Sequence, residues 1–284
     1  MPGLTNFISV VRLSEKFPED QVLRAVSSLN KQIVRDFGPI WGVTAVVDAV
    51  FDPQQVTPAK WVIALVDDLQ HSGLAAFHGW TSGVPYAAVE MTPTWTISLS
   101  HECLEMLADP FGELRVAGDS PASNQGRVEF LLEVCDPCQS DEHAYDVDGV
   151  MMSDFYTPNY FDPVFSPGVR YSFKENSLPR PLHVPPGGYL TWRNPSDDCW
   201  YQYDYLTSQP IINVVNAPSG VLGRRTVDQM MRRRDKAFWK RRHAALPPGF
   251  KLFDDSFFNG NAERFQKLRQ AIKMHDKRKK RKKG

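Results

Sequence analysis

The chain has 284 residues, 42% hydrophobic and 23% charged, which is enough to bury a substantial core and is typical of a soluble globular protein. No apolar run reaches the roughly 18 residues of a membrane-spanning helix, and no apolar stretch follows a basic start, so we expect no membrane span, no signal peptide and a cytoplasmic protein. The formal net charge is zero, but residues 221–284 hold 21 Lys and Arg against 6 Asp and Glu, whereas residues 1–220 hold 12 against 27.

This uneven charge predicts two regions with different roles. Residues 1–220 are expected to form one α+β domain with an extension rich in aromatic residues and proline. Residues 221–284 are expected to form a basic arm, with helices at about 225–244 and 261–275.

The first ninety residues contain short runs of apolar and β-branched residues, which favour strands. These runs lie at 6–13, 42–51, 61–66, 74–78 and 86–90, and the second is apolar enough to predict a buried strand. A helix is predicted after the first run, because Pro18, Glu19 and Asp20 are typical of a helix start. Apolar residues then recur at helical spacing: Val22, Leu23, Val26, Leu29, Ile33 and Val34.

The segment at 94–109 predicts a largely buried helix beneath this sheet, since it is flanked by apolar residues along its length. Helix signals are scarce after Pro110. Runs at 128–134 and 149–155 are strand-like, Gly149 marks a hairpin, and most of the remainder predicts irregular structure packed by aromatic residues.

Four side chains with metal-binding or acid–base chemistry lie on the predicted helix. His101 and Glu105 are four residues apart and therefore share one helical face. In the HExxH motif two histidines at this spacing bind zinc, and the Glu after the first acts as a general base. Here a carboxylate takes the second ligand position, and Glu102 follows His101. Asp109 is a further ligand, a residue that orients a ligand, or the residue that ends the helix before Pro110.

The sequence Ser100-His-Glu-x-x-Glu, with Asp109-Pro110 after it and Glu133-Val-x-Asp136-x-Cys138 downstream, resembles a zincin-like, metallopeptidase-related family. Its relatives occur in bacteria and phages, and it is more distantly similar to secreted plant and fungal proteins of the exordium type. The stretch from Phe77 to Pro85 also resembles the strand pair that precedes the helix in the bacterial relatives. The resemblance covers about residues 74–165 and implies a mixed sheet with the motif helix beneath it.

The resemblance also implies roles for individual residues. His101 and Glu105 would be metal ligands, Glu133 and Asp136 would supply one or two more, and Glu102 would be the base. His78 would contact substrate or stabilise an oxyanion on the strand that lines the cleft, although a hydrogen-bonded histidine at a strand end explains it equally well. The expected ion is zinc, and calcium is the alternative.

The cysteines and a second acidic segment have simpler explanations. Cys103, Cys135, Cys138 and Cys199 are interpreted as reduced thiols, because Cys135 and Cys138 form the one CxxC pair and a zinc knuckle needs two. Residues 141–148 are rich in oxygen ligands that suit calcium, but they lack EF-hand spacing, so a solvated loop is the better interpretation.

The basic arm has the composition of a polyanion-binding segment, and any such binding would be electrostatic and salt-sensitive. Aromatic residues interleave upstream of its end and are suited to docking on a partner or stacking on bases. The alternatives are simple solvation and neutralisation by the acidic domain. The candidate polyanion-binding residues are Arg232, Arg233, Arg234, Lys240, Arg241, Arg242, Lys277, Arg278, Lys279, Lys280, Arg281, Lys282 and Lys283.

Two functional hypotheses follow from different classes. The first is a metal-dependent hydrolase that cleaves peptides, with Glu102 as base. The second is a structural or interaction protein, a phage virion component, that keeps a zincin-like scaffold and uses its basic arm to bind neighbouring subunits or nucleic acid. Loss of assembly on deleting 221–284 would favour the second.

Overall fold

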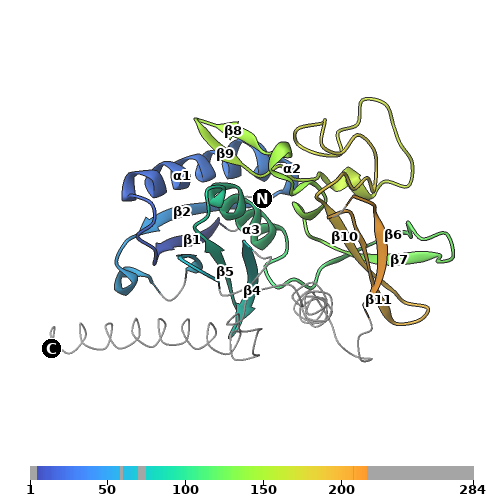
Figure 1. Cartoon of the computed structure of the whole chain (residues 1–284), viewed down its shortest axis with the longest axis horizontal. Helices are drawn as coiled ribbons and strands as arrows, with labels where there is room; N and C mark the ends of the chain where they lie inside the picture. The colour runs from blue at the N-terminus through green and yellow to red at the C-terminus, as the bar shows by residue number, and fades with distance from the viewer. Residues whose placement is uncertain (1–4, 58–59, 70–74, 207, 216–284) are drawn as a thin grey trace, which may run out of the picture.

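The computed structural model describes residues 5–57, 60–69, 75–206 and 208–215. The two helices expected in the basic arm, and all of its candidate polyanion-binding residues, lie outside this range. The described part is a mixed α+β structure with two five-stranded sheets, one hairpin and few helices (Figure 1). No helix in the described residues has the length and apolar character needed to cross a bilayer.

The first sheet contains all five strands predicted near the N-terminus, in the order β2-β1-β3-β5-β4. Their bounds are Thr5–Arg12 (β1), Thr44–Val50 (β2), Trp61–Val66 (β3), Ala76–Thr81 (β4) and Val84–Glu90 (β5). Four strands are parallel, and β4 runs antiparallel to β5 at one edge. The turn between β4 and β5 is shorter than expected, because Ser82 and Gly83 both adopt positive φ, at 51° and 72°.

The expected burial of the second strand is wrong in part. β2 is an edge strand of the sheet, and Val46 on it is 50% exposed. Residues Ala45, Val47 and Val50 of the same strand are buried. An edge strand that packs against a helix on one face alternates between core and solvent, which a run of valine and alanine conceals in the sequence.

Two helices cover one face of this sheet (Figure 1). Helix α1 (Glu19–Lys31) continues through a π-helical turn (Gln32–Phe37) into α2 (Gly38–Trp41), which ends at Gly42 with φ of 68°. Of its predicted apolar residues, Val22, Val26, Leu29 and Ile33 are buried, because they fall on one face of the helix. Leu23 and Val34 lie off that face and are 52% and 64% exposed.

The predicted motif helix is confirmed as α3 (Trp95–Ala108), which lies over β4 and β5. It is buried on several sides, with Trp95, Leu99, Leu104 and Met106 all at 3% exposure or less. A helix that is apolar around most of its circumference belongs to the interior of a domain. The chain leaves the helical conformation at Asp109, the residue before Pro110.

The middle of the chain holds a second sheet. The strand expected at 128–134 overlaps one of its strands, but the expectation of irregular structure for most of the remainder is wrong. Its strands are all antiparallel, in the order β12-β11-β10-β7-β6. Their bounds are Arg115–Asp119 (β6), Arg127–Leu131 (β7), Tyr189–Asn194 (β10), Cys199–Asp204 (β11) and Ile211–Val215 (β12). Polar residues occupy buried positions in it: Gln202 donates a hydrogen bond to Thr191 across β10 and β11 at 3.2 Å. Such residues obscure the alternation that identifies a strand.

The hairpin expected around Gly149 is confirmed. β8 (Tyr145–Val147) pairs with β9 (Val150–Met152), and Asp148 and Gly149 turn between them at positive φ. The hairpin lies against α1 and α3. Four short 3-10 helices complete the described structure, at Pro53–Gln55, Asp136–Cys138, Asp141–His143 and Pro158–Phe161. One hydrophobic cluster includes residues from α1, α3 and both large sheets.

Candidate metal centre

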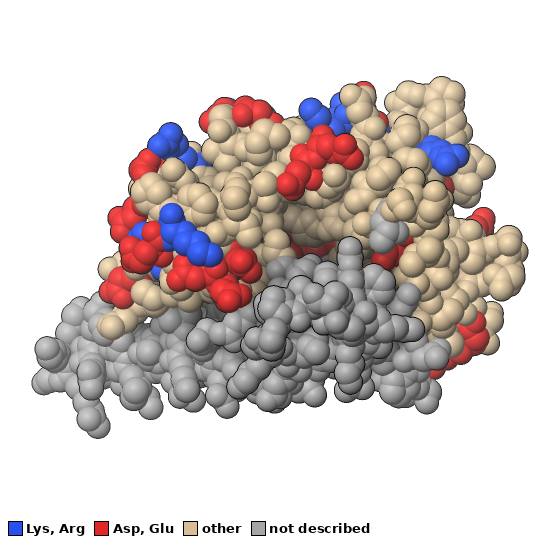
Figure 2. Space-filling model, in the orientation of Figure 1, with Lys and Arg blue, Asp and Glu red and all other residues tan. Residues whose placement is uncertain are grey.

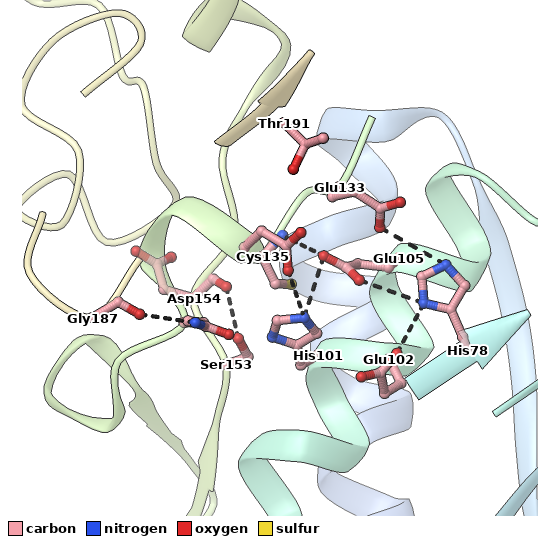
Figure 3. A network of polar contacts seen from close by, with 12 residues as sticks. His78, His101, Glu102, Glu105, Glu133, Cys135, Ser153, Asp154, Gly187 and Thr191 are labelled. Atoms are coloured by element: carbon pink, nitrogen blue, oxygen red, sulfur yellow. Dashed lines mark hydrogen bonds and ion pairs between the residues drawn. The ribbon is translucent and has the colours of Figure 1, made fainter. Parts of the chain in front are cut away.

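Seven side chains with metal-ligand chemistry gather at the end of α3 that faces the second sheet (Figure 3). They come from three segments that are far apart in the sequence: α3, the edge strand β4, and the chain that follows β7. They are His78, His101, Glu102, Glu105, Glu133, Cys135 and Asp136.

Helix α3 points its three site residues in two directions. His101 and Glu105 lie one turn apart on the same face, and Glu102 is rotated by one helical step toward β4. The serine of the motif holds the helix in place: Ser100 Oγ donates to Gln32 Oε1 at 2.7 Å and accepts from the Ser153 amide at 3.1 Å. The position of the helix is therefore set by the π-helical turn that follows α1 on one side and by the chain after β9 on the other.

Glu105 lies at the centre of the cluster and is 0% exposed. Its Oε1 is 3.3 Å from His101 Nε2 and accepts a hydrogen bond from the Cys135 amide at 3.2 Å. Its Oε2 is 3.5 Å from His78 Nδ1. Figure 3 shows the carboxylate between the two imidazole rings.

His101 connects the helix to the segment after β7. Its Nε2 faces Asp136 Oδ1 at 3.3 Å as well as Glu105. Burial by itself would lower the pKa of His101, but the charge of Glu105 and the contact with Asp136 outweigh it, so the pKa is raised well above its ordinary value. The side chain is 12% exposed, against 6% or less for His78, Glu102, Glu105, Glu133 and Asp136.

His78 lies within the cluster rather than on an open wall, because its side chain is 1% exposed. Its Nδ1 is 2.8 Å from Glu102 Oε2, and its Nε2 is 3.8 Å from Glu133 Oε2. Within the described residues Nε2 is buried and makes no hydrogen bond. The residue expected to contact substrate therefore touches three of the carboxylates.

The turn at Asp136–Cys138 is fixed by the second sheet. Gly188, just before β10, packs so closely on Pro137 that an added Cβ would lie 2.0 Å from the Pro137 oxygen. Gln139 Nε2 also donates to the Gly187 oxygen at 2.8 Å. The placement of Asp136 beside His101 thus depends on a glycine about fifty residues later in the chain.

Two sets of donor atoms are close enough to share an ion. His101, Glu105 and Cys135 form one set, and His78, Glu105 and Glu133 form the other, with all atoms of a set within 4.8 Å of one another. Both sets contain Glu105. Asp136 lies beside the first set, because its Oδ1 is 3.3 Å from His101 Nε2. Among the described residues no set of this kind occurs at 141–148, where Asp148 pairs with Lys31 and Asp146 accepts from the Gly149 amide.

Asp109, expected to be a ligand, a residue that orients one, or the end of the helix, is placed at the helix end. Its carboxylate accepts hydrogen bonds from the amides of Phe111 at 3.4 Å and Leu114 at 2.7 Å. It is 1% exposed and organises the turn that leads to β6. The structure therefore places it in the chain reversal after α3.

Sequence reasoning missed two residues at the site. The sequence indicates only that Cys135 is a reduced thiol, whereas in the structure its sulfur is one of the donor atoms. Burial is the main cause that raises the pKa of this thiol, and the nearby charge of Glu105 raises it further. Tyr156 was one of many aromatic residues in the middle segment. Its amide donates to the Val134 oxygen at 2.8 Å, which fixes it beside Glu133 and Cys135. Its hydroxyl is buried without a hydrogen bond among the described residues, and burial and the charge of Glu133 raise its pKa.

The surface near the middle of the molecule is hollowed between the part built on the first sheet and the part built on the second, and acidic side chains lie at its edge (Figure 2). Comparison of the chain with models of known protein families, with curated proteins and with solved structures gave no match. The function is therefore inferred from the side chains of the site.

Proposed function

We propose that this chain is a zincin-like divalent-metal protein that hydrolyses peptide bonds. The observation that carries the proposal is the convergence of His101, Glu105 and Asp136, from a buried helix and a distant segment, around one imidazole nitrogen. Several buried carboxylates beside histidines are costly without a cation, because each ionised group loses its hydration. A cation would offset that cost.

The donor set fits zinc better than calcium. Imidazole nitrogen, carboxylate oxygen and cysteine sulfur are all zinc ligands, whereas calcium takes six to eight oxygens. His101, Glu105 and Asp136 would hold the ion, with Cys135 within reach. When bound, a divalent cation supplies Lewis-acid polarisation of a carbonyl and makes water more acidic near neutral pH.

Glu102 is the residue that we propose as general base. It lies next to His101 in the helix and is 3% exposed. Its Oε2 is hydrogen-bonded to His78 Nδ1 at 2.8 Å. A carboxylate in that position can take a proton from water and later return it to the leaving amine. The hydrogen bond from His78 fixes its orientation.

Tyr156 is the residue that we propose to stabilise the oxygen of the reacting carbonyl. Its hydroxyl makes no hydrogen bond to any residue that the structure describes, so its proton can be donated to a substrate, and burial keeps it protonated at neutral pH because its pKa is raised. A donor fixed in a site that excludes water stabilises developing negative charge strongly.

The edge strand β4 supports a peptide as the substrate class. β4 is the last strand of the first sheet in the described residues, and it carries His78. An extended peptide can add to the edge strand of a sheet through main-chain hydrogen bonds. A peptide in that position would run alongside the cluster.

The test is the pair of variants Glu102→Gln and Glu142→Gln, the second at an exposed acid away from the cluster. Purified full-length protein is expected to bind zinc in native mass spectrometry and to cleave a dye-labelled unfolded protein. Glu102→Gln is expected to keep the zinc and lose turnover by about a hundred- to ten-thousandfold, while Glu142→Gln matches the wild type. Equal turnover in Glu102→Gln contradicts the assigned base, and a protein that takes up no cation contradicts the proposal as a whole.

A further inference from the structure

We propose that the cluster holds two divalent cations bridged by Glu105, the second of them in a subsite formed by His78 and Glu133. The inference rests on the proposed metal binding and extends it, because it makes His78 a ligand instead of a substrate contact. Three independent features of the cluster support it.

The first feature is the orientation of the Glu105 carboxylate. Oε1 faces His101 Nε2 at 3.3 Å, and Oε2 faces His78 Nδ1 at 3.5 Å. Each oxygen is thus directed toward a different histidine, as Figure 3 shows. A carboxylate that served a single ion together with His101 would leave its other oxygen beside the second ring. A carboxylate between two ions binds one ion with each of its two oxygens.

The second feature is the state of the His78 ring. Nδ1 lies 2.8 Å from Glu102 Oε2, so in the neutral ring it carries the proton and leaves a lone pair on Nε2. That nitrogen is buried, makes no hydrogen bond within the described residues, and faces Glu133 Oε2 at 3.8 Å. Histidine ligands commonly donate their other N–H to a carboxylate, which fixes the ring for the metal. Glu102 would therefore be a positioning residue for His78 as well as a base.

The third feature is the charge of the cluster. Glu102, Glu105, Glu133 and Asp136 are 0–5% exposed. When ionised they carry four negative charges, and an imidazole that binds a cation is neutral and offsets none of them. One divalent cation balances half of this charge, and unbalanced charge in a protein interior is unfavourable. Two divalent cations balance it.

Each subsite uses a different histidine, and Glu105 belongs to both. Glu105 Oε2 lies on the Nδ1 side of the His78 ring, and the His78 donor assigned to the ion is Nε2, which faces Glu133. Glu105 Oε1 and Asp136 Oδ1 both face His101 Nε2, and His78, Glu105 and Glu133 form the separate set of three. Two-metal sites of this kind occur in hydrolytic enzymes, where the ions clamp the attacking and leaving oxygens of the reaction.

Zinc stoichiometry of the full-length protein tests the inference. The protein is stripped with a chelator, titrated with zinc, and weighed by native mass spectrometry, alongside His78→Ala and the matched control His183→Ala at a half-buried histidine outside the cluster. We expect two zinc ions in the wild type and in His183→Ala, and one in His78→Ala. Glu133→Gln is expected to behave like His78→Ala and replaces it if the alanine variant does not fold.

A second measurement uses the wild type alone. With manganese as the probe, two ions that share a carboxylate are magnetically coupled, so their electron paramagnetic resonance spectrum differs from that of isolated ions. A coupled spectrum is expected. One zinc ion in the wild type, or two in His78→Ala, overturns the second subsite and leaves the proposed metal binding intact. A wild type that takes up no zinc overturns both proposals.

Discussion

Replacing Gly188 by alanine tests how the second sheet positions the metal site. An added Cβ would lie 2.0 Å from the Pro137 oxygen and 2.7 Å from its carbonyl carbon, whereas ordinary contact begins at 3.4 Å. The turn and the start of β10 must therefore separate by about 1.4 Å, the difference between 3.4 and 2.0 Å. The obstacle is main chain, so no side-chain rotation relieves it.

Overpacking of this kind costs about 1–3 kcal/mol, and contact with main chain places Gly188→Ala near the upper end. For a folded region of about two hundred residues, a loss of about 3 kcal/mol lowers the melting temperature by roughly 6–12 °C. Asp136 precedes the displaced proline, so zinc affinity is also expected to fall by about tenfold or more, as it does when groups that orient ligands are removed.

The assay is thermal unfolding followed by circular dichroism, together with competition for zinc against a chromogenic chelator. Gly126→Ala is the control, because an added Cβ there meets nothing within 4 Å. It is expected to melt at or slightly above the wild-type temperature, since alanine restricts the unfolded chain. The reasoning is refuted if Gly188→Ala melts within about 1 °C of Gly126→Ala and binds zinc as tightly as the wild type.

Three further predictions concern single buried groups. Burial raises the pKa of Asp154 to about 6, so the folded state binds more protons than the unfolded state between about pH 4 and 6, and stability falls as the pH rises through that window. Urea unfolding at pH 4 and pH 7 is expected to show this loss, up to about 3 kcal/mol, in the wild type but not in Asp154→Asn; equal pH dependence would contradict the assignment. Ser100→Ala removes the hydrogen bonds to Gln32 and Ser153 and is expected to lower the free energy of unfolding in urea by about 2 kcal/mol. The control Ser98→Ala is expected to change it little. Similar values for both variants would show that Ser100 does not anchor α3. Tyr156→Phe is expected to leave the melting temperature and zinc stoichiometry unchanged, because the hydroxyl makes no hydrogen bond within the described part of the chain. It is expected to lower turnover by about a hundredfold, and an unchanged rate would remove its proposed role.

The first sheet and the motif helix could be predicted because their signals are local. Runs of β-branched residues identified β1, β3 and β5, and an apolar segment ending before Pro110 identified α3. Helical spacing alone put His101 and Glu105 on one face. These features depend on neighbours within a few residues, which is the range over which sequence patterns are informative.

Apart from the run at 128–134, which overlaps β7, the second sheet could not be predicted, because its strands bury polar groups and β7 pairs with the distant β10. Gln202 donates a hydrogen bond to Thr191 across β10 and β11, so both polar side chains can be buried. In the sequence they look like surface residues. The expectation of irregular structure came from reading each strand by itself.

The sequence by itself determined which residues carry metal-ligand chemistry and which of them share a turn of helix. Only the tertiary structure decided that His78 faces Glu102, Glu105 and Glu133, that Cys135 and Tyr156 belong to the same cluster, and that Asp109 ends the helix. The reason is physical: a ligand set is a matter of distances between atoms, and here those distances are set by the packing of β4, α3 and a turn held by Gly188.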